Sequence, residues 1–567
     1  MTLSDLRSAR RTIVLATLSL APVALAAPDS IWIADVVTVD DARPRAEAVA
    51  VEDGRISAVG AVDEVLALAD ARTRIERPDG VIVPGFVDAH GHVWLTGVQS
   101  LFADLLPPPD GGVRDLADMA STLKAWAEAE TLDLPGGWIV GMGYDDAELD
   151  EQRHPTRAEL DAVSSTRPVF AIHQSLHLGA VNSVALARLG IRADTPDPPG
   201  GHYRRGADGE PNGVLEETAF RAALGPIFGG LQNLGSERIV RGGLETYMAN
   251  GFTTAQDGAA NPASVGDFTR AAAEAPLPID VIAFPIMEAA LADAVSERIG
   301  APYRGGFRVG GVKLVLDGSP QGKTAWLTRR YHVVPDGRGP EYAGYATYPD
   351  ARVAAWIDLA FERAWPVLAH ANGDAAADQL IRAVRKATDR RGRGDRRTVM
   401  IHAQTVRDDQ LDAMADLDMV PSFFTAHTFY WGDWHRDSVL GPVRADRISP
   451  TRSALDRGLR FTAHHDSPVV KPNPLRILHA TVNRRTRSGD ILGPSERVDA
   501  LTALKSTTLW AARQHFEEGD KGSIEVGKLA DFAVLSGDPL RVPIDTLMAL
   551  SVRGTVKRGE WVYRAAP

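Results

Sequence analysis

Short apolar segments alternate with helical patterns through the middle of the chain, and this alternation restricts the fold more than any other feature. Eight apolar segments are predicted to be strands: residues 82–87, 252–256, 279–284, 309–316, 366–369, 398–401, 419–423 and 459–463. Helices are predicted where apolar residues recur every three or four positions, at residues 351–363, 375–386 and 407–414. Because strands that alternate with helices form parallel sheets, the pattern predicts a (β/α)8 barrel.

The two ends of the chain share a different pattern, in which short β-like segments are separated by turn residues. Residues 48–51 and 55–59 flank Asp53-Gly54, which predicts a hairpin with a tight turn. Further strands are predicted near the C-terminus, at residues 522–526, 532–535, 551–557 and 560–563. We therefore expect residues 27–83 and 515–567 to form one small β domain beside a barrel of residues 84–514.

A long stretch separates the first and second predicted barrel strands. It covers about residues 101–234 and contains a further strand-like segment at residues 168–172. Loops longer than about 15 residues without structure of their own are uncommon in compact domains. The sequence therefore predicts an inserted subdomain after barrel strand 1.

Composition narrows the classes of function that this chain can have. The 567 residues include no cysteine, which excludes disulfides, cysteine-ligated zinc, iron–sulfur clusters and thiol catalysis. A metal site must therefore use histidine, carboxylates or a modified side chain. The formal charge of −12 argues against a nucleic-acid partner held through its phosphates.

The N-terminus has the pattern of a secretory signal peptide. Arg7, Arg10 and Arg11 precede an apolar run over residues 12–27, and small residues at 24–26 suit cleavage after Ala26. We expect residues 1–26 to be removed and the protein to be secreted or periplasmic; the arginine pair also permits twin-arginine export. An uncleaved membrane anchor is the alternative. No later segment is long and apolar enough to span a membrane, so no membrane association is expected after signal removal.

The segment PGFVDAHGH at residues 84–92 ends the first predicted barrel strand. In an extended chain His90 and His92 point to one side and can present both imidazoles to one cation. Alone, such a pair is more often two ordinary hydrogen-bonded histidines. Its position favours a metal site, because barrel active sites assemble at the C-terminal ends of the strands.

Other barrel strands end in further ligand-type residues: Lys313, His370, His402 and Asp466. Individually, His370 and His402 could be buried core histidines and Asp466 a helix cap. Their occurrence at one rim favours a shared metal centre instead. Strand alternation places Lys313 toward the barrel interior, so it needs either an ion pair with Asp317 or Asp466, or a depressed pKa. A neutral amine could react with carbon dioxide to form a carbamate, an anionic ligand able to bridge two cations.

These segments together resemble the amidohydrolase superfamily, in particular its YtcJ-like (amidohydrolase 3) branch. The resemblance rests on PGFVDAHGH, the Lys313 strand with DGS after it, HANGDAAAD, HAQ, HDSPV and GSIEVGKLADFAVL, and in the insertion on GMGYDD, LDAVSSTRPVF, HLGAVNSVAL and PDPPGG. It extends from about residue 31 to residue 563. It implies a distorted TIM barrel with a flanking β-sandwich and a one- or two-metal centre, usually zinc.

The resemblance also implies a ligand set. His90, His92 and Asp466 would hold one zinc ion and His370 and His402 a second, with carboxylated Lys313 between them. Two departures from the branch concern the substrate side. His464 and His465 precede Asp466 where many relatives have Gly-Ser, so His465 could supply an extra imidazole beside the centre, and SPQGKTAW follows the Lys313 strand in place of a Gly-Ser-Arg type of segment.

A water shared by two divalent cations is acidic enough to form hydroxide near neutral pH. We expect this hydroxide to attack a carbonyl carbon while Asp466 transfers a proton to the leaving group. The aromatic segment 423–435 supplies His427, Trp431 and His435 as candidate substrate-binding residues, with His177 and His465 as further candidates. A packed lid without substrate contact is the alternative for the aromatic segment.

The function predicted from the sequence is a metal-dependent hydrolase that cleaves an amide or other non-peptide carbon–nitrogen bond of a small, aromatic or apolar molecule. A lactonase, esterase or deaminase could use the same centre, because the cations determine the nucleophile and not the leaving group. An extracytoplasmic protein that binds metal or ligand without turnover is the alternative from another class. The partner is a small-molecule substrate, and a homodimer is left open.

Overall fold

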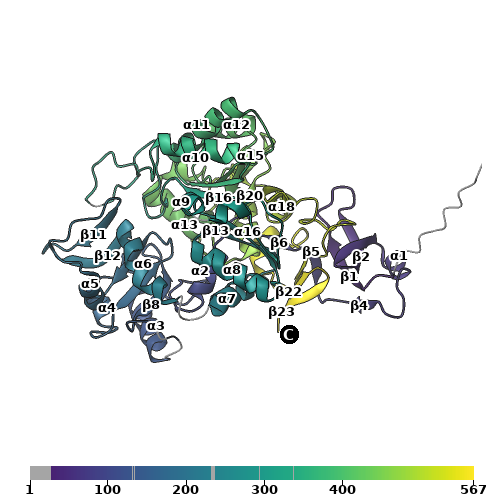
Figure 1. The fold of residues 1–567 in the computed structure, drawn as a ribbon, viewed down its shortest axis with the longest axis horizontal. Coiled ribbons are helices and arrows are strands. Elements are labelled where there is room, and N and C mark those ends of the chain that lie inside the picture. Colours follow the sequence, from purple (N-terminus) through teal and green to yellow (C-terminus); the bar gives the residue numbers. More distant parts are fainter. Residues whose placement is uncertain are drawn as a thin grey trace, which may run out of the picture.

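The computed structural model describes residues 27–566, apart from residues 130, 131, 133, 232–235, 293 and 336. The predicted signal peptide, residues 1–26, lies outside this part of the chain and stays a prediction. A barrel occupies the centre of the molecule, with the insertion on one side and a sheet built from both chain ends on the other (Figure 1). The central part is a TIM-barrel-like α/β fold, as the alternation of strands and helices predicts.

Two parallel sheets form the wall of the barrel. The first has the order β15-β14-β13-β6 and consists of β6 (Phe86–Val87), β13 (Phe252–Ala260), β14 (Asp280–Pro285) and β15 (Phe307–Val309). The second has the order β16-β17-β18-β19-β20 and consists of β16 (Val312–Val315), β17 (Val367–Ala371), β18 (Val399–His402), β19 (Val420–Phe423) and β20 (Thr462–Ala463). The sheets meet through a bridge between Ile286 and Lys313, and on the other side the Asp466 amide donates to His90 O at 3.1 Å.

Two of the eight predicted barrel strands are divided in the structure. Residues 309–316 were expected as one strand, but Gly310 and Gly311 separate β15 from β16. The backbone passes so close to its neighbours there that a Cβ on Gly311 would lie 2.2 Å from Pro366 O. Residues 82–87 divide in the same way, because β5 (Val81–Pro84) joins the sheet of the chain ends and only β6 joins the barrel.

The three predicted helices lie close to their expected positions, as α10 (Asp350–Glu362), α11 (Asp374–Arg391) and α12 (Asp408–Asp416). The charges at the two ends of α11 stabilise it: Asp374 is in its first turn and two arginines are in its last, which suits the helix dipole. Leu380, Val384 and Ala387 recur on one face of α11 and are buried. These helices cover the outside of the barrel wall (Figure 1).

Strands from both ends of the chain form one sheet with the order β23-β22-β21-β5-β1-β2-β3, and β4 pairs with β1. Its other members are β1 (Ser30–Val37), β2 (Arg45–Glu52), β3 (Arg55–Gly60), β4 (Arg74–Glu76), β21 (Phe532–Leu535), β22 (Val552–Lys557) and β23 (Glu560–Arg564). The expected hairpin is present, with Asp53 and Gly54 at positive φ between β2 and β3. Residues 522–526, in contrast, form turns and irregular structure and not a strand.

The chain-end sheet is continuous by hydrogen bonding, where the resemblance implies two packed sheets. Its N-terminal and C-terminal strands nevertheless share a core, because the Trp32 ring packs 5.9 Å from Phe532 and 5.0 Å from Trp561. A buried ionic contact fastens this sheet to the barrel: Lys557 Nζ lies 2.7 Å from Asp280 and 2.8 Å from Asp531. Both chain ends thus support one side of the barrel.

The insertion forms a six-stranded mixed sheet with the order β11-β12-β10-β9-β8-β7. Its strands are β7 (Ala103–Asp104), β8 (Ile139–Tyr144), β9 (Val169–His173), β10 (Leu178–Val181), β11 (Gly201–Arg205) and β12 (Pro211–Glu217). It has a core of its own, in which Leu105, Leu123 and Val169 are buried. The segment predicted at residues 168–172 is β9.

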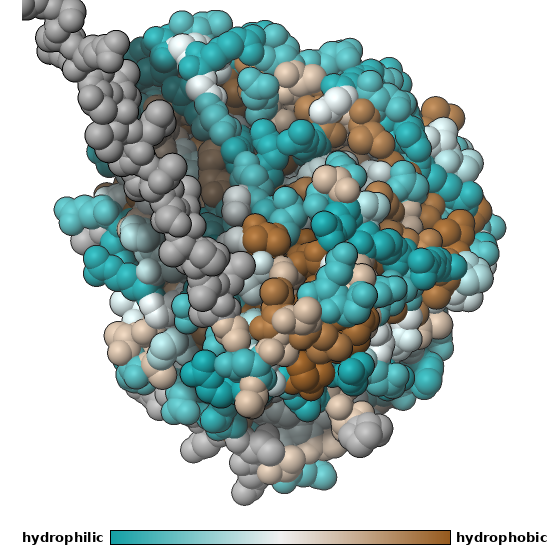
Figure 2. Space-filling view, turned by 90° about the vertical axis from the view of Figure 1, so that its right-hand side faces the viewer, coloured by the Kyte–Doolittle hydropathy of each residue, from teal (hydrophilic) through white to brown (hydrophobic). Residues whose placement is uncertain are grey.

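Figure 2 views the molecule from the end that carries the chain-end sheet, where hydrophilic residues cover most of the surface and apolar residues gather in smaller patches. Val526 is the most exposed large apolar side chain of the chain-end region among the described residues, at 65%. Within the same described part of the chain, no helix is both long enough and apolar enough to cross a membrane.

Candidate metal centre

The side chains predicted as metal ligands lie in barrel strands or just after them. Lys313 is in β16, His370 in β17 and His402 is the last residue of β18. His90 and Asp466 follow the ends of β6 and β20, which adjoin where the barrel closes. Parallel strands bring their C-terminal ends to one rim, so residues far apart in the sequence meet there.

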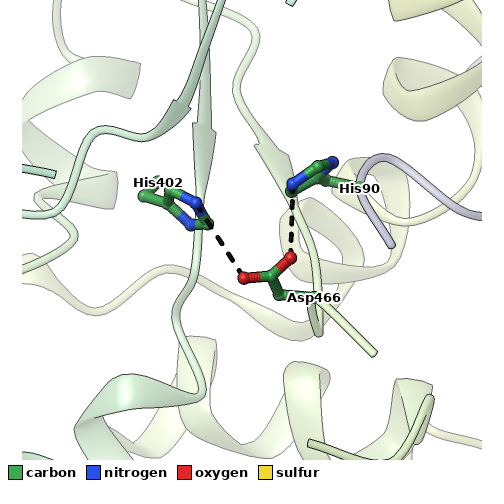
Figure 3. Close-up of side chains that lie close together, drawn as sticks. All are labelled: His90, His402 and Asp466. Atoms are coloured by element: carbon green, nitrogen blue, oxygen red, sulfur yellow. Dashed lines mark ion pairs between the residues drawn. The ribbon is translucent and has the colours of Figure 1, made fainter. Parts of the chain in front are cut away.

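His90, His402 and Asp466 form the centre of this group (Figure 3). Each offers one ligand atom, and these atoms all lie within 4.8 Å of one another. The Asp466 carboxylate lies between the two rings: Oδ1 is 3.2 Å from His90 Nε2 and Oδ2 is 3.9 Å from His402 Nε2. All three side chains are buried.

The remaining predicted ligands surround this trio. His92 Nε2 lies 3.1 Å from Asp466 Oδ1, and His370 Nδ1 lies 3.0 Å from His402 Nε2. Lys313 Nζ lies 2.9 Å from His90 Nε2. The structure therefore brings all six predicted side chains into one cluster, as the resemblance implies.

Burial keeps three of the four imidazoles of this cluster in their neutral form. It lowers the pKa of His90, His370 and His402 well below the usual value, and the neighbouring Lys313 and histidines lower it further. A neutral imidazole has the free lone pair that a metal ion requires. These three histidines can thus bind a cation without first losing a proton.

Lys313 is 1% exposed, and burial lowers the pKa of its amine to about 7, although the charge of Asp466 opposes the shift. Among the described residues, no carboxylate oxygen lies within 4.0 Å of Lys313 Nζ, the distance that defines an ion pair. Asp317, one of the two expected partners, instead accepts the backbone N–H groups of Trp326, Asn372 and Gly373. This arrangement favours the alternative in which Lys313 is a neutral amine.

Two residues behind the ligands were not predicted from the sequence as site residues. Gln256 in β13 has its Oε1 2.7 Å from His90 Nδ1, while its Nε2 donates to Ala89 O at 2.8 Å. This fixes the amide orientation, so His90 Nδ1–H donates to Gln256 and Nε2 is left toward Asp466. Similarly, His464 Nε2 lies 3.2 Å from His402 Nδ1. The sequence did indicate His464, because His464-His465 differs from the Gly-Ser of many relatives. A single glutamine in a strand, such as Gln256, gives no such indication.

His177 lies on the insertion side of the centre, immediately before β10, and its ring is 6.3 Å from that of His370. Its Nδ1 is 3.0 Å from Glu217 Oε2. Burial opposes protonation of this histidine, but the charge of Glu217 prevails and raises the pKa of His177. The insertion therefore contributes a polar group close to the barrel rim, where the sequence placed a candidate substrate residue.

The other predicted substrate residues are all buried. His427 and Trp431 lie in α13 (His427–Trp434) and His435 follows it; His427 Nδ1 is 2.9 Å from His435 Nε2, and Trp431 donates to Asp145 Oδ2 at 2.7 Å. This packing favours the lid without substrate contact. His465 packs between the rings of Tyr247 and Phe252 and is therefore a core histidine in this structure, not an extra imidazole facing a substrate.

The donor set fits a divalent metal centre. Four imidazoles, a carboxylate and a buried amine converge, and His92 Nδ1 is a buried atom without a hydrogen-bond partner among the described residues. Nitrogen and carboxylate oxygen are the donors that zinc and similar ions take in proteins. A TIM-barrel-like fold with this centre at its C-terminal rim defines a metal-dependent hydrolase.

The comparisons with known proteins identify the family. The chain belongs to the amidohydrolase family, whose model matches residues 79–563. It is 30% identical over 546 residues to the N-substituted formamide deformylase of Arthrobacter pascens, covering 94% of this chain and 97% of that protein. It is 28% identical over 552 residues to the putative amidohydrolase YtcJ of Bacillus subtilis, covering 93% and 98%. The chain is thus a hydrolase that acts on carbon–nitrogen bonds, and the predicted family is confirmed.

Solved structures share the fold. A metal-dependent hydrolase from Pyrococcus horikoshii superposes with a TM-score of 0.72 at 22% identity, covering 91% of this chain and 99% of that one. An atrazine chlorohydrolase from Arthrobacter aurescens TC1, solved in complex with zinc, gives a TM-score of 0.51 at 14% identity, covering 94% and 95%. At these identities the similarity shows the fold alone.

Proposed function

We propose that the chain hydrolyses the non-peptide carbon–nitrogen bond of a small amide, and that N-substituted formamides are the first substrate class to test. The observation that carries the proposal is the convergence of His90, His402 and Asp466 at the barrel rim. The substrate class is supported by the similarity to a formamide deformylase over almost the whole chain.

The proposal assigns the predicted ligands to two zinc ions. His90, His92 and Asp466 would hold one ion and His370 and His402 the other. Lys313 would lie between them after its neutral amine adds to carbon dioxide and loses one proton, which yields an anionic carbamate. When bound, such metals acidify a water molecule and polarise a carbonyl oxygen.

Asp466 is the residue that we assign to proton transfer. Its Oδ1 lies 3.1 Å from His92 Nε2 and 3.2 Å from His90 Nε2, which places the carboxylate at the centre. From there it would take the proton of the attacking water and deliver it to the leaving nitrogen. A leaving amine needs this proton because an unprotonated amide nitrogen is a poor leaving group.

His177 would bind the substrate carbonyl region from the insertion side. Because Glu217 engages Nδ1, the Nε2 atom of His177 is left to donate a hydrogen bond. The raised pKa of His177 supports a donor at this position.

A panel of N-substituted formamides, acetamides, lactones and aminopurines tests the proposal on zinc-loaded protein, with released formate, amine, acid and ammonia measured separately. We expect formamide hydrolysis that is lost on chelation and restored by zinc. Hydrolysis of lactones alone would favour the lactonase alternative, and ammonia release from aminopurines alone would favour a deaminase. Binding of panel members without any turnover would replace the proposal with the binding-protein alternative.

A further inference from the structure

A second cluster of metal-ligating side chains lies in the insertion, away from the barrel strands. Asp146, His154 and His173 each offer one ligand atom, and these atoms all lie within 4.8 Å of one another. Asp146 Oδ1 is 3.0 Å from His173 Nε2, and Asp146 Oδ2 is 3.6 Å from His154 Nε2. Both imidazoles therefore direct the same kind of nitrogen toward one carboxylate.

Two neighbouring parallel strands and one loop bring these residues together. His173 ends β9 and is paired with Tyr144 at the end of β8, and Asp146 follows two residues later. His154 precedes α4 (Arg157–Asp161), whose start is fixed by the capping box of Thr156 and Glu159. The cluster thus lies on ordered backbone at the C-terminal edge of these strands.

The outer nitrogens of both imidazoles have hydroxyl partners. Tyr144 Oη lies 3.1 Å from His154 Nδ1, and Ser175 Oγ lies 2.9 Å from His173 Nδ1, where the Ser175 backbone amide also approaches to 3.0 Å. Metal-binding histidines usually have their second nitrogen held in this way, which orients the ring. The arrangement leaves both Nε2 atoms facing Asp146, although the Ser175 amide donates to His173 Nδ1 and so competes with a proton on that nitrogen.

Charge and access also suit a cation. Asp145 adds a second carboxylate, with Oδ1 3.7 Å from His173 Nε2. Asp146 and His154 line a cavity of about 570 Å³ between the insertion and the segment that follows β16, which gives an ion a path from solvent.

We propose that Asp146, His154 and His173 bind a divalent transition-metal ion, best matched by zinc, at a structural site separate from the barrel centre. Tetrahedral zinc with bonds of about 2.0 to 2.2 Å places its donors roughly 3.3 to 3.6 Å apart, and the two oxygens of Asp146 approach the His173 and His154 rings to 3.0 Å and 3.6 Å. The ion would tie β8, β9 and the loop before α4 together. Through Asp145, which holds Trp431, it would also steady the contact between the insertion and α13.

The alternative state of this cluster is metal-free, with a proton on His173 in place of the metal ion. Burial disfavours the charged ring, but the hydrogen bonds that it donates to Asp145 and Asp146 prevail and raise the pKa of His173 to about 9. A cation and this proton exclude each other, so the two states differ in metal content and not only in stability.

The amount of bound metal distinguishes the metal-bound state from the protonated state, and its measurement needs no activity assay. Wild-type protein, Asp146→Asn and a His154→Gln/His173→Gln variant would be equilibrated with zinc, desalted and assayed by elemental analysis, with circular dichroism as a check on folding. Each variant is expected to hold one zinc equivalent fewer than wild type. The exposed His202→Gln variant, from the same cavity, is the matched control and should hold the wild-type amount.

A reciprocal variant keeps the test decisive if the cluster variants fail to fold. His90→Ala/His402→Ala removes barrel ligands and leaves the insertion cluster intact, so it should retain zinc, and with cobalt it should give the visible absorption of a site with nitrogen and oxygen ligands. Wild-type zinc content in the folded cluster variants would overturn the proposal, as would a reciprocal variant that binds no metal. If the wild-type protein does not hydrolyse formamides but the cluster variants still hold less zinc than wild type, the proposed function is wrong and this metal site is not.

Discussion

Asp466 faces three histidines of the centre, because its two oxygens lie within 4.0 Å of His90, His92 and His402. The carboxamide of Asp466→Asn has nearly the same shape and can still offer an oxygen to a metal, but it cannot accept and return a proton. We expect kcat to fall by about 10² to 10⁴ while much of the metal stays bound, as measured by steady-state kinetics and elemental analysis.

The exposed Asp490→Asn is the control for this substitution and should leave kcat unchanged. If the kcat of Asp466→Asn stays within a few-fold of wild type, the carboxylate does not transfer the proton.

His464 acts through His402 and not on the substrate. Its Nε2 faces His402 Nδ1, and Ser422 Oγ lies 3.0 Å from its own Nδ1, so the three residues form a hydrogen-bonded row that orients the ligand. Loss of such a partner weakens metal binding by about 10-fold to 100-fold. We expect His464→Ala to raise the zinc Kd by this factor in a chelator competition assay.

A buried histidine of another region, His479, provides the comparison for His464. Equal zinc affinities for His464→Ala, His479→Ala and wild type would show that the row does not position His402.

At the scale of elements, periodicity identified the barrel strands but not where two of them divide. Gly310 and Gly311 interrupt the apolar run, and the chain divides into β15 and β16 at this pair, where an added Cβ would meet Phe284 and Pro366. Residues 82–87 contain Pro84-Gly85 between apolar residues. The strands on either side, β5 and β6, are both buried but belong to different sheets, which the apolar pattern does not show.

The segment of α13 and the π-helical turn at His435–Val439 buries two histidines against each other. Burial lowers the pKa of His435 to about 3, whereas an unfolded histidine titrates near 6.5. Between these values the unfolded chain binds the proton and the folded chain does not, so stability falls as the pH decreases below about 6.5. His435→Gln should therefore show a shallower loss of unfolding free energy between pH 6.5 and 4.5.

Urea titrations at several pH values measure this slope, with the exposed His202→Gln as the matched substitution. A slope for His435→Gln as steep as that of wild type would mean that His435 is not held neutral in the folded protein.

At the scale of the molecule, the chain-end sheet connects the first and last described segments. Trp32 in β1 is fully buried against Phe532 and Trp561, which belong to strands about 500 residues further along the chain. Truncation of a large buried aromatic side chain typically costs about 3 to 5 kcal/mol. We expect a loss of this size in the free energy of unfolding of Trp32→Ala, measured by urea denaturation of the metal-loaded protein.

Leu68→Ala, which shortens a partly exposed side chain of the same region, should change the unfolding free energy by less than about 1 kcal/mol. Equal stability of the two variants would show that the chain-end core does not support the whole molecule.

The sequence predicts a site residue when its role follows from its position along a strand. It does not predict a residue whose role follows from packing between distant segments. The close approach of six side chains could be predicted, because parallel barrel strands bring residues in and just after them to one rim: His90, His92, Lys313, His370, His402 and Asp466. Gln256 could not, since its role comes from facing His90 across two strands. The aromatic segment was equally ambiguous, because exposure in a lid and burial in a core use the same residue types, and the structure shows burial of Trp431.

The most direct test of the metal centre is a crystal structure of the zinc-loaded protein with anomalous diffraction measured at the zinc edge. We predict density peaks within bonding distance of His90, His92 and Asp466 and of His370 and His402, with extra density on Lys313 Nζ for the carbamate. An absence of any anomalous peak among His90, His402 and Asp466 in fully loaded crystals would contradict the metal-dependent mechanism proposed for this protein.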